Sequence, residues 1–233
     1  GRGTDNLKGG LGNDTIYGNN GKDVIAGGGG DDILDGGKKA DTIFGGGGND
    51  TILGSNGHDR LNGGPDADTI DGGNGTDTAT YGNAPSGVTA NLATGVVSGG
   101  AGAGSLSNVE RLEGSPYNDT LTGNAGVNRI EGGAGDDTIF GGDGNDVLDG
   151  EDGNDDIDGQ EGQDTVRGRD GNDTMTGGAG DDVLNGAAGN DTAYGNTGDD
   201  FINGGTGADI LNGGLGNDEI NGNSGDDTIF GGA

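Results

Sequence analysis

The stretch Gly27–Leu53, GGGGDDILDGGKKADTIFGGGGNDTIL, combines two features that rarely occur together. Its glycine and aspartate content is that of a flexible acidic linker, yet an aliphatic residue returns at Leu34, Ile43 and Ile52, at intervals of nine. A fixed period of this kind is typical of repeat architectures. The stretch therefore predicts three rows of a repeating fold.

The same period extends over most of the 233-residue chain. Rows of nine run from Gly9 to Thr80 and again from Gly114 to Phe230, and we number the positions of each row from one to nine. All twenty-one full rows begin with glycine, and the sixth position is Asp in every row except one, which has Asn128. The eighth position is nearly always Ile or Leu, so the repeat has a fixed phase that a random glycine linker would lack.

The composition restricts the possible functions. The chain has 63 Gly, 41 acidic and 10 basic side chains, a net charge of −31 and only 26% hydrophobic residues. So much negative charge repels nucleic acid phosphates and anionic lipid headgroups, and neither is expected as a partner. The absence of Cys excludes thiolate metal sites, and no apolar run approaches membrane-spanning length, so no membrane insertion is expected. A cationic partner is expected instead.

Each row predicts a turn followed by a strand. Glycine at the first, second and fourth positions suits a six-residue turn with positive φ angles. Positions seven to nine favour a three-residue strand in which only the eighth side chain points inward. Two rows then complete a coil, and rows two apart stack in parallel about 4.8 Å apart. The expected fold class is all-β, a right-handed parallel β-roll (β-solenoid) with two nine-residue repeats per coil.

This stacking places each sixth-position Asp beside its counterpart two rows on, where like charges repel strongly. A divalent cation between them would compensate this repulsion. Carboxylate and backbone carbonyl oxygens favour a hard cation, and Ca²⁺ tolerates loose geometry better than Mg²⁺ does. Nine such Asp residues in the first block form seven pairs and thirteen rows in the second form eleven, which predicts up to about 18 calcium ions.

The pattern GGxGxDxUx, where U is a large aliphatic residue, resembles that of the RTX (repeats-in-toxin, hemolysin-type calcium-binding) nonapeptide proteins. The resemblance implies a calcium-loaded parallel β-roll in which sixth-position carboxylates and turn carbonyls bind the ions. The ligands that it implies in the first block are Asp5, Asp14, Asp23, Asp32, Asp41, Asp50, Asp59, Asp68 and Asp77. Those that it implies in the second block are Asp119, Asp137, Asp146, Asp155, Asp164, Asp173, Asp182, Asp191, Asp200, Asp209, Asp218 and Asp227. The family is mostly exported by type I machinery, so a secreted, extracellular or cell-surface bacterial protein without a cleavable N-terminal signal is expected.

Several rows depart from the pattern. Lys39 and Asp66 replace the fourth-position glycine, so the sites that use Asp41 and Asp68 are expected to bind calcium less well. Asn128 carries no charge, and a weaker site is expected there too.

An insert at 81–113 separates a first repeat block, 1–80, from a second, 114–233. Apolar residues alternate within 88–97 around a short turn, which predicts a hairpin or two extra strands. Glu110 falls in the phase of the sixth position. The insert either continues the roll as irregular coils or separates two rolls.

We expect a calcium-binding structural module that folds outside the cell, where it spaces or displays other domains of a longer parent chain or assists export and refolding. The alternative is an adhesive or ice-binding surface on the same roll, although ice binding favours Thr at the third position, which only Thr197 and Thr206 supply. Catalysis within this chain is not expected. His58 lies at the variable fifth position, and adjacent carboxylates such as Asp31 and Asp32 recur row after row, which a catalytic pair has no need to do.

Overall fold

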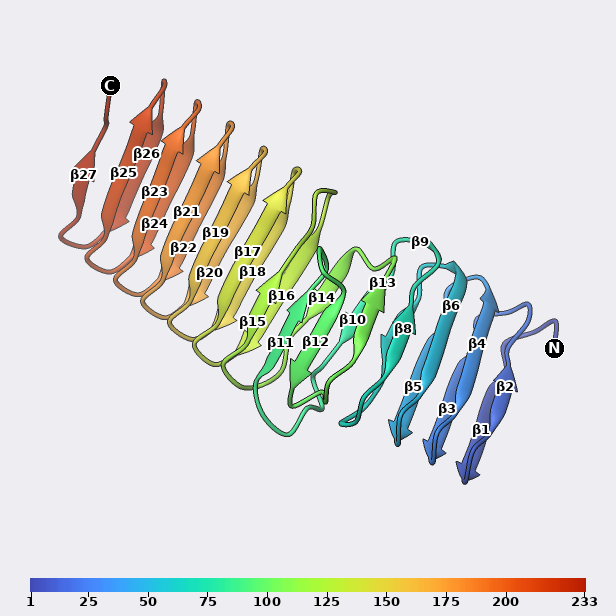
Figure 1. The fold of residues 1–233 in the computed structure, drawn as a ribbon. Helices are drawn as coiled ribbons and strands as arrows, with labels where there is room; N and C mark the ends of the chain where they lie inside the picture. Colours follow the sequence, from blue (N-terminus) through green and yellow to red (C-terminus); the bar gives the residue numbers. More distant parts are fainter. The chain divides into compact units, whose positions relative to one another are not determined.

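The computed structural model describes residues 1–233 and contains strands and turns without helices. No helix is therefore present that is long and apolar enough to cross a membrane. The chain forms two compact units, Gly1–Ser115 and Pro116–Ala233, so the insert at 81–113 belongs to the first. Within each unit, short turns join successive strands, and alternate strands lie side by side in the same sheet (Figure 1).

The first unit has two sheets to which the chain contributes strands in alternation. One sheet contains, in order, β1 (Asn6–Leu11), β3 (Val24–Gly29), β5 (Thr42–Gly47), β7 (Arg60–Asn62), β10 (Thr78–Thr80) and β14 (Arg111–Glu113). The other contains β2 (Thr15–Tyr17), β4 (Ile33–Lys38), β6 (Thr51–Gly57), β8 (Thr69–Asp71), β13 (Ser105–Ser107), β12 (Val96–Gly99) and β11 (Val88–Asn91), with β9 (Asn74–Gly75) paired to β6.

The second unit repeats this arrangement without an insert. One sheet contains β16 (Arg129–Ala134), β18 (Val147–Asp152), β20 (Thr165–Asp170), β22 (Val183–Ala188), β24 (Phe201–Thr206) and β26 (Glu219–Ser224). The other contains β15 (Thr120–Thr122), β17 (Thr138–Asp143), β19 (Asp156–Glu161), β21 (Thr174–Ala179), β23 (Thr192–Thr197), β25 (Ile210–Leu215) and β27 (Thr228–Phe230).

The register confirms a coil of two nonapeptides. Between the repeat rows, neighbouring strands are parallel and paired residues are 18 apart, as in Ile25 with Ile43 in the first unit and Leu148 with Val166 in the second. Rows two apart therefore stack in register, so equivalent residues form columns. The predicted parallel β-roll, a β-solenoid with two repeats per coil, is the observed fold.

The prediction of three-residue strands is wrong for most rows. The regular strands have six residues, because pairing continues from positions seven to nine into positions one to three of the next row. In β3 and β5, for example, Gly28 pairs with Gly46 and Gly29 with Gly47. The backbone N–H and C=O groups of stacked glycines pair in the same way as those of the other strand residues. Only positions four to six therefore remain as turn.

Positive φ angles occur at the second and fourth positions, as predicted, but not at the first. Gly28 (φ 117°) and Gly30 (φ 114°) show the pattern, and it persists where a side chain replaces glycine, as at Glu151 (φ 75°) and Lys39 (φ 77°). The conformation is therefore retained at these two residues without glycine, whereas Asp66 and Tyr117, which also replace the fourth-position glycine, do not adopt it. The first-position glycine therefore has a role other than a positive φ angle.

The core of each unit is a column of eighth-position side chains. Of these, Ile25, Leu34, Ile43, Ile52, Leu61 and Ala79 in the first unit are fully buried, as are Leu121, Ile130, Ile139, Leu148, Ile157, Val166, Met175, Leu184, Ala193, Ile202 and Leu211 in the second. One apolar side chain per row makes a thin core, so the turns must contribute to stability.

The insert extends both sheets of the first unit. β13 pairs in parallel with β8, with Ser105 opposite Thr69, and β14 pairs in parallel with β10, with Arg111 opposite Thr78. β11 and β12 form an antiparallel hairpin, at the residues for which a hairpin was expected. Irregular coils therefore continue the roll within this unit.

Candidate metal centre

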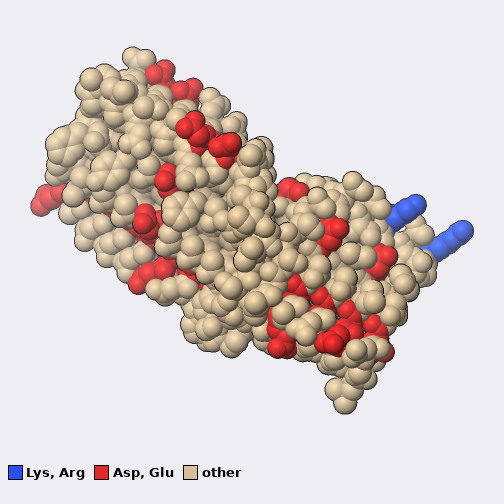
Figure 2. Space-filling model, in the orientation of Figure 1, with Lys and Arg blue, Asp and Glu red and all other residues tan.

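The predicted ligands form columns at the turns of the coils. All but five of the sixth-position Asp side chains are at most 3% exposed; Asp68 is 5% exposed, and Asp5, Asp14, Asp218 and Asp227 are partly exposed. On the face in Figure 2, acidic side chains cover limited areas, and most of the visible surface is neither acidic nor basic. Much of the charge of −31 is therefore inside the turns.

One oxygen of each carboxylate joins two coils. The backbone N–H of a sixth-position residue donates to Oδ1 of the Asp 18 residues later, as from Asp32 to Asp50 at 2.8 Å and from Asp173 to Asp191 at 2.9 Å. The bond recurs in all seven pairs of the first unit. It also recurs in all eleven pairs of the second. The structure thus brings together every predicted pair, including the one that begins with Asn128.

Glu110 continues the column of the first unit. Its Oε2 accepts the N–H of Asp77 at 2.8 Å, which is the bond that an Asp makes elsewhere. The phase noted in the sequence therefore identified the residue correctly, although the insert makes the separation 33 residues instead of 18.

The second oxygen of the carboxylate is buried without a hydrogen-bond partner in seventeen of these residues. They are Asp14, Asp23, Asp32, Asp41, Asp50, Asp59 and Asp77 in the first unit and Asp137, Asp146, Asp155, Asp164, Asp173, Asp182, Asp191, Asp200, Asp209 and Asp218 in the second. An unsatisfied buried polar group costs about 1–3 kcal/mol, and more if it is charged. Because a whole domain is stable by only about 5–15 kcal/mol, so many orphaned oxygens require another partner.

The first-position glycine leaves space at this oxygen. A Cβ on Gly27 would overlap Asp32 Oδ2 and would lie 2.7 Å from the carbonyl oxygen of Gly45 in the next coil. A Cβ on Gly159 would likewise overlap Asp164 Oδ2 and lie 2.5 Å from the Gly177 carbonyl oxygen. A carboxylate oxygen and a carbonyl oxygen of the next coil therefore converge on a small space that any side chain would fill.

The oxygens in this space fit calcium. No three His, Cys, Asp or Glu side chains come together anywhere in the structure, so an ion would also need backbone carbonyl ligands, as the sequence predicted. Ca²⁺ accepts such mixed oxygen ligands in flexible geometry. The individual ligand assignments stay predictions.

Burial makes these carboxylates resist ionisation. It raises the pKa of Asp137 to about 8 and the pKa values of Asp59, Asp173 and Asp182 to about 7. The N–H donated by the preceding coil lowers each pKa, and the charges of neighbouring carboxylates raise it again. A bound cation would remove this penalty, because it stabilises the ionised form.

The family model of the RTX calcium-binding nonapeptide repeat matches the chain in overlapping segments that together cover 1–79 and 107–233. The chain belongs to this family. The matches omit 80–106, which is most of the insert. No curated protein sequence matches the chain.

The RTX rows contain a second ladder, at the fifth position, that sequence reasoning missed. Here the side-chain oxygen accepts the N–H of the residue 18 later, as from Asp31 to Asn13 at 3.0 Å and from Asn190 to Asn172 at 2.8 Å. The bonds recur along the column of Asn118, Asp136, Asn154, Asn172 and Asn190. The recurrence of Asn and Asp at this position was the signal that could have found it.

His58 belongs to the same ladder. Its Nδ1 accepts the N–H of Thr76 at 2.8 Å, and the side chain is exposed. The residue therefore takes the place of an Asn or Asp in an RTX turn, which is a structural role and gives no support to a catalytic one.

Asp149 shows how a buried carboxylate is satisfied in this roll without a metal. It is 1% exposed at a ninth position, and Arg169 donates to it from Nε and Nη2, each at 2.6 Å. Arg167 Nη1 lies 3.9 Å from Asp149 Oδ2. The seventeen sixth-position carboxylates with an orphaned oxygen have no such cation from the protein, which sets them apart.

Proposed function

We propose that this RTX chain is a structural module whose folding depends on calcium and that it acts outside the cell. The observation that supports this most strongly is the set of seventeen buried carboxylate oxygens without partners, each beside a first-position glycine. Oxygens from two coils line most of these spaces, so an ion there would join neighbouring coils as well as neutralise charge.

The two oxygens of each sixth-position carboxylate have different roles. Each sixth-position Oδ1 accepts an N–H and thereby fixes the carboxylate, while Oδ2 and the first-position carbonyl of the next coil would bind the ion. Calcium supplies the positive charge that makes ionised carboxylates stable in this position. Because the site requires stacked coils, the ion binds the folded state selectively, and its binding free energy becomes folding free energy.

The proposed location follows from calcium availability. Extracellular calcium modules bind with dissociation constants of about 10⁻⁴–10⁻³ M, so such a chain stays unfolded where calcium is scarce and folds where it is millimolar. Export by a type I route, with folding afterwards, is part of the proposal. So is a role as spacer, display or refolding element for other domains of a parent chain, without catalysis and without nucleic acid or membrane partners.

A calcium titration followed by far-UV circular dichroism tests the proposal, with magnesium as the control. We expect a coil spectrum in chelator, a cooperative gain of β signal at up to millimolar calcium, and little response to magnesium. A coil spectrum that persisted at millimolar calcium would refute calcium-driven folding. A β spectrum in chelator at neutral pH would show that the thin aliphatic core is sufficient without the ion.

A further inference from the structure

The basic residues of the second unit gather on one sheet. This unit has only three of them, Arg129 on β16 and Arg167 and Arg169 on β20, and β18 lies between these two strands. The coils that follow, from residue 171 to the end of the chain, contain acidic side chains and no basic one. Any protein cation that compensates a carboxylate of this unit is therefore confined to the coils that contain β16, β18 and β20.

An ion pair joins two of these coils. Asp149 on β18 is the one buried ninth-position residue of the second unit, whereas every other ninth-position residue there is at least partly exposed. Arg169 of the next coil donates from Nε to its Oδ1 and from Nη2 to its Oδ2, each at 2.6 Å. Bidentate hydrogen bonds between two charged groups are among the strongest in proteins. The interface between β18 and β20 therefore contains its own cation.

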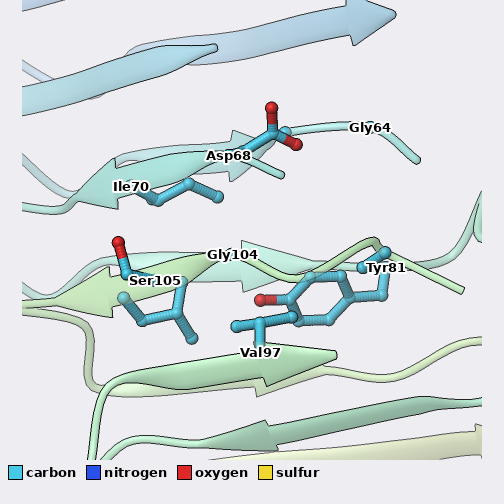
Figure 3. A pocket seen from close by; sticks show the side chains of 10 residues that line it. Gly64, Asp68, Ile70, Tyr81, Val97, Gly104 and Ser105 are labelled. Atoms are coloured by element: carbon cyan, nitrogen blue, oxygen red, sulfur yellow. The ribbon is translucent and has the colours of Figure 1, made fainter. Parts of the chain in front are cut away.

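A regular sixth-position carboxylate has no such partner. Figure 3 shows Asp68 of the first unit beside a small cavity, and the other residues that line this cavity, such as Ile70 and Val97, carry no charge. Burial raises the pKa of Asp68 to about 6, and the charges of neighbouring carboxylates raise it further. An interface of this kind needs an ion from solution, unlike the interface at Asp149.

The same coils also lack one sixth-position charge. Asn128 directly precedes β16, and its N–H donates to Asp146 Oδ1 at 2.8 Å, as the N–H of an Asp does in other rows. Its side-chain oxygen accepts the N–H of Asn124 at 2.7 Å. The hydrogen bond between the coils of β16 and β18 is thus kept with one negative charge fewer, and the repulsion in the absence of an ion is smaller.

We propose that the coils containing β16, β18 and β20 are the nucleus from which calcium-dependent folding of the second unit starts, and that the Asp149–Arg169 pair holds them together. The inference rests on the proposed function, because it assumes that the other interfaces need calcium. In a repeat fold each coil contacts only its neighbours, so folding begins at the most favourable interface and spreads from there. These coils still contain sixth-position carboxylates, so they fold at a lower calcium concentration than the others and not without calcium.

Hydrogen–deuterium exchange of the full chain at graded calcium concentrations tests this inference. We expect the backbone amides of β18 and β20 to become protected at calcium concentrations several-fold below those that protect β24 and β26 of the same sheet. Arg169→Gln should abolish this difference. Arg129→Gln is the matched control: it removes the same charge, but Arg129 pairs with Glu131 of its own strand and so joins no coils.

Two results would overturn the inference: simultaneous protection of all strands of the second unit, or an unchanged difference in Arg169→Gln. Protection that does not depend on calcium in any strand would refute the proposed function instead.

A double variant covers the possibility that Arg169→Gln does not fold even in saturating calcium, because it leaves the buried charge of Asp149 uncompensated. Asp149→Asn combined with Arg169→Gln removes both charges and keeps polar groups that hydrogen-bond. We expect a full β spectrum in saturating calcium and no early protection of β18 and β20. Early protection that persisted in the double variant would show that the ion pair is not its source.

Discussion

The two ladders of each turn differ in what they need. At the fifth position, exposed side chains such as Asn172 accept an N–H from the next coil, so that this donor is satisfied by the protein. At the adjacent sixth position, Asp173 is 1% exposed and has one satisfied and one orphaned oxygen. The fifth-position hydrogen bonds therefore form without an ion, whereas the second oxygen of the sixth-position carboxylate requires one.

The largest effect is expected on the β signal of the calcium-free chain when the pH is changed. The folded-state pKa values of about 7–8 at Asp137, Asp173 and Asp182 lie above the unfolded value of 3.8. Protonation therefore favours the fold: this stabilisation is fully present below pH 3.8 and is lost as pH rises through 7–8. Far-UV circular dichroism of calcium-free protein should show more β signal at pH 4 than at pH 8. A signal that increased with pH would contradict the role assigned to the sixth column.

Two alanine substitutions in the same strand, β5, test the space at the first position. A Cβ on Gly45 would overlap Asp50 Oδ2 and the Gly63 carbonyl oxygen, whereas a Cβ on Gly47 meets nothing within 4 Å. We expect Gly45→Ala to lose one ion and to lower the free energy of unfolding in calcium by about 1–3 kcal/mol or more. Gly47→Ala should change it by less than about 0.5 kcal/mol. Equal effects in chemical denaturation would show that the first position has no special role.

Removing one charge from the sixth column should have a smaller effect. Asp173→Asn keeps an oxygen to accept the Asp155 N–H but has no negative charge for an ion. We expect the loss of one bound calcium and a several-fold higher calcium midpoint in the circular dichroism titration. An unchanged ion count would remove Asp173 from the ligands, and Asp173→Ala, which also loses the hydrogen bond, should be less stable than Asp173→Asn.

The smallest effect is expected at the fifth column. Asn172→Ala removes the acceptor of the Asn190 N–H, which is exposed enough for water to replace it. We expect a loss of about 0.5–1.5 kcal/mol in the free energy of unfolding and an unchanged ion count. A lost ion in this variant would mean that the two ladders are not independent.

The sequence predicted the features that depend on period alone. The coil, the aliphatic column and the pairing of Asp32 with Asp50 all follow once rows two apart are stacked, because a fixed spacing determines which residues meet. The phase of Glu110 was found in the same way, despite the irregular insert.

The features that were missed depend on the direction of backbone groups. Composition explains glycine at the first position by turn conformation, but only coordinates show that a Cβ there would meet the Asp carboxylate. Which oxygen accepts which N–H is likewise a matter of geometry, so the fifth ladder was overlooked. Gly99–Ser107 is a degenerate row that could have been found from its glycines and Leu106, but its lack of a sixth-position Asp concealed it.

The two ladders run in opposite directions along the chain. At the fifth position the earlier coil provides the acceptor, as Asn154 does for Asn172, while at the sixth the later coil provides it, as Asp191 does for Asp173. Each coil thus donates a fifth-position N–H to the coil before it, and its sixth-position carboxylate accepts an N–H from that same coil. A coil shifted by one residue would lose both matches at once, so the paired ladders favour the correct register of each coil.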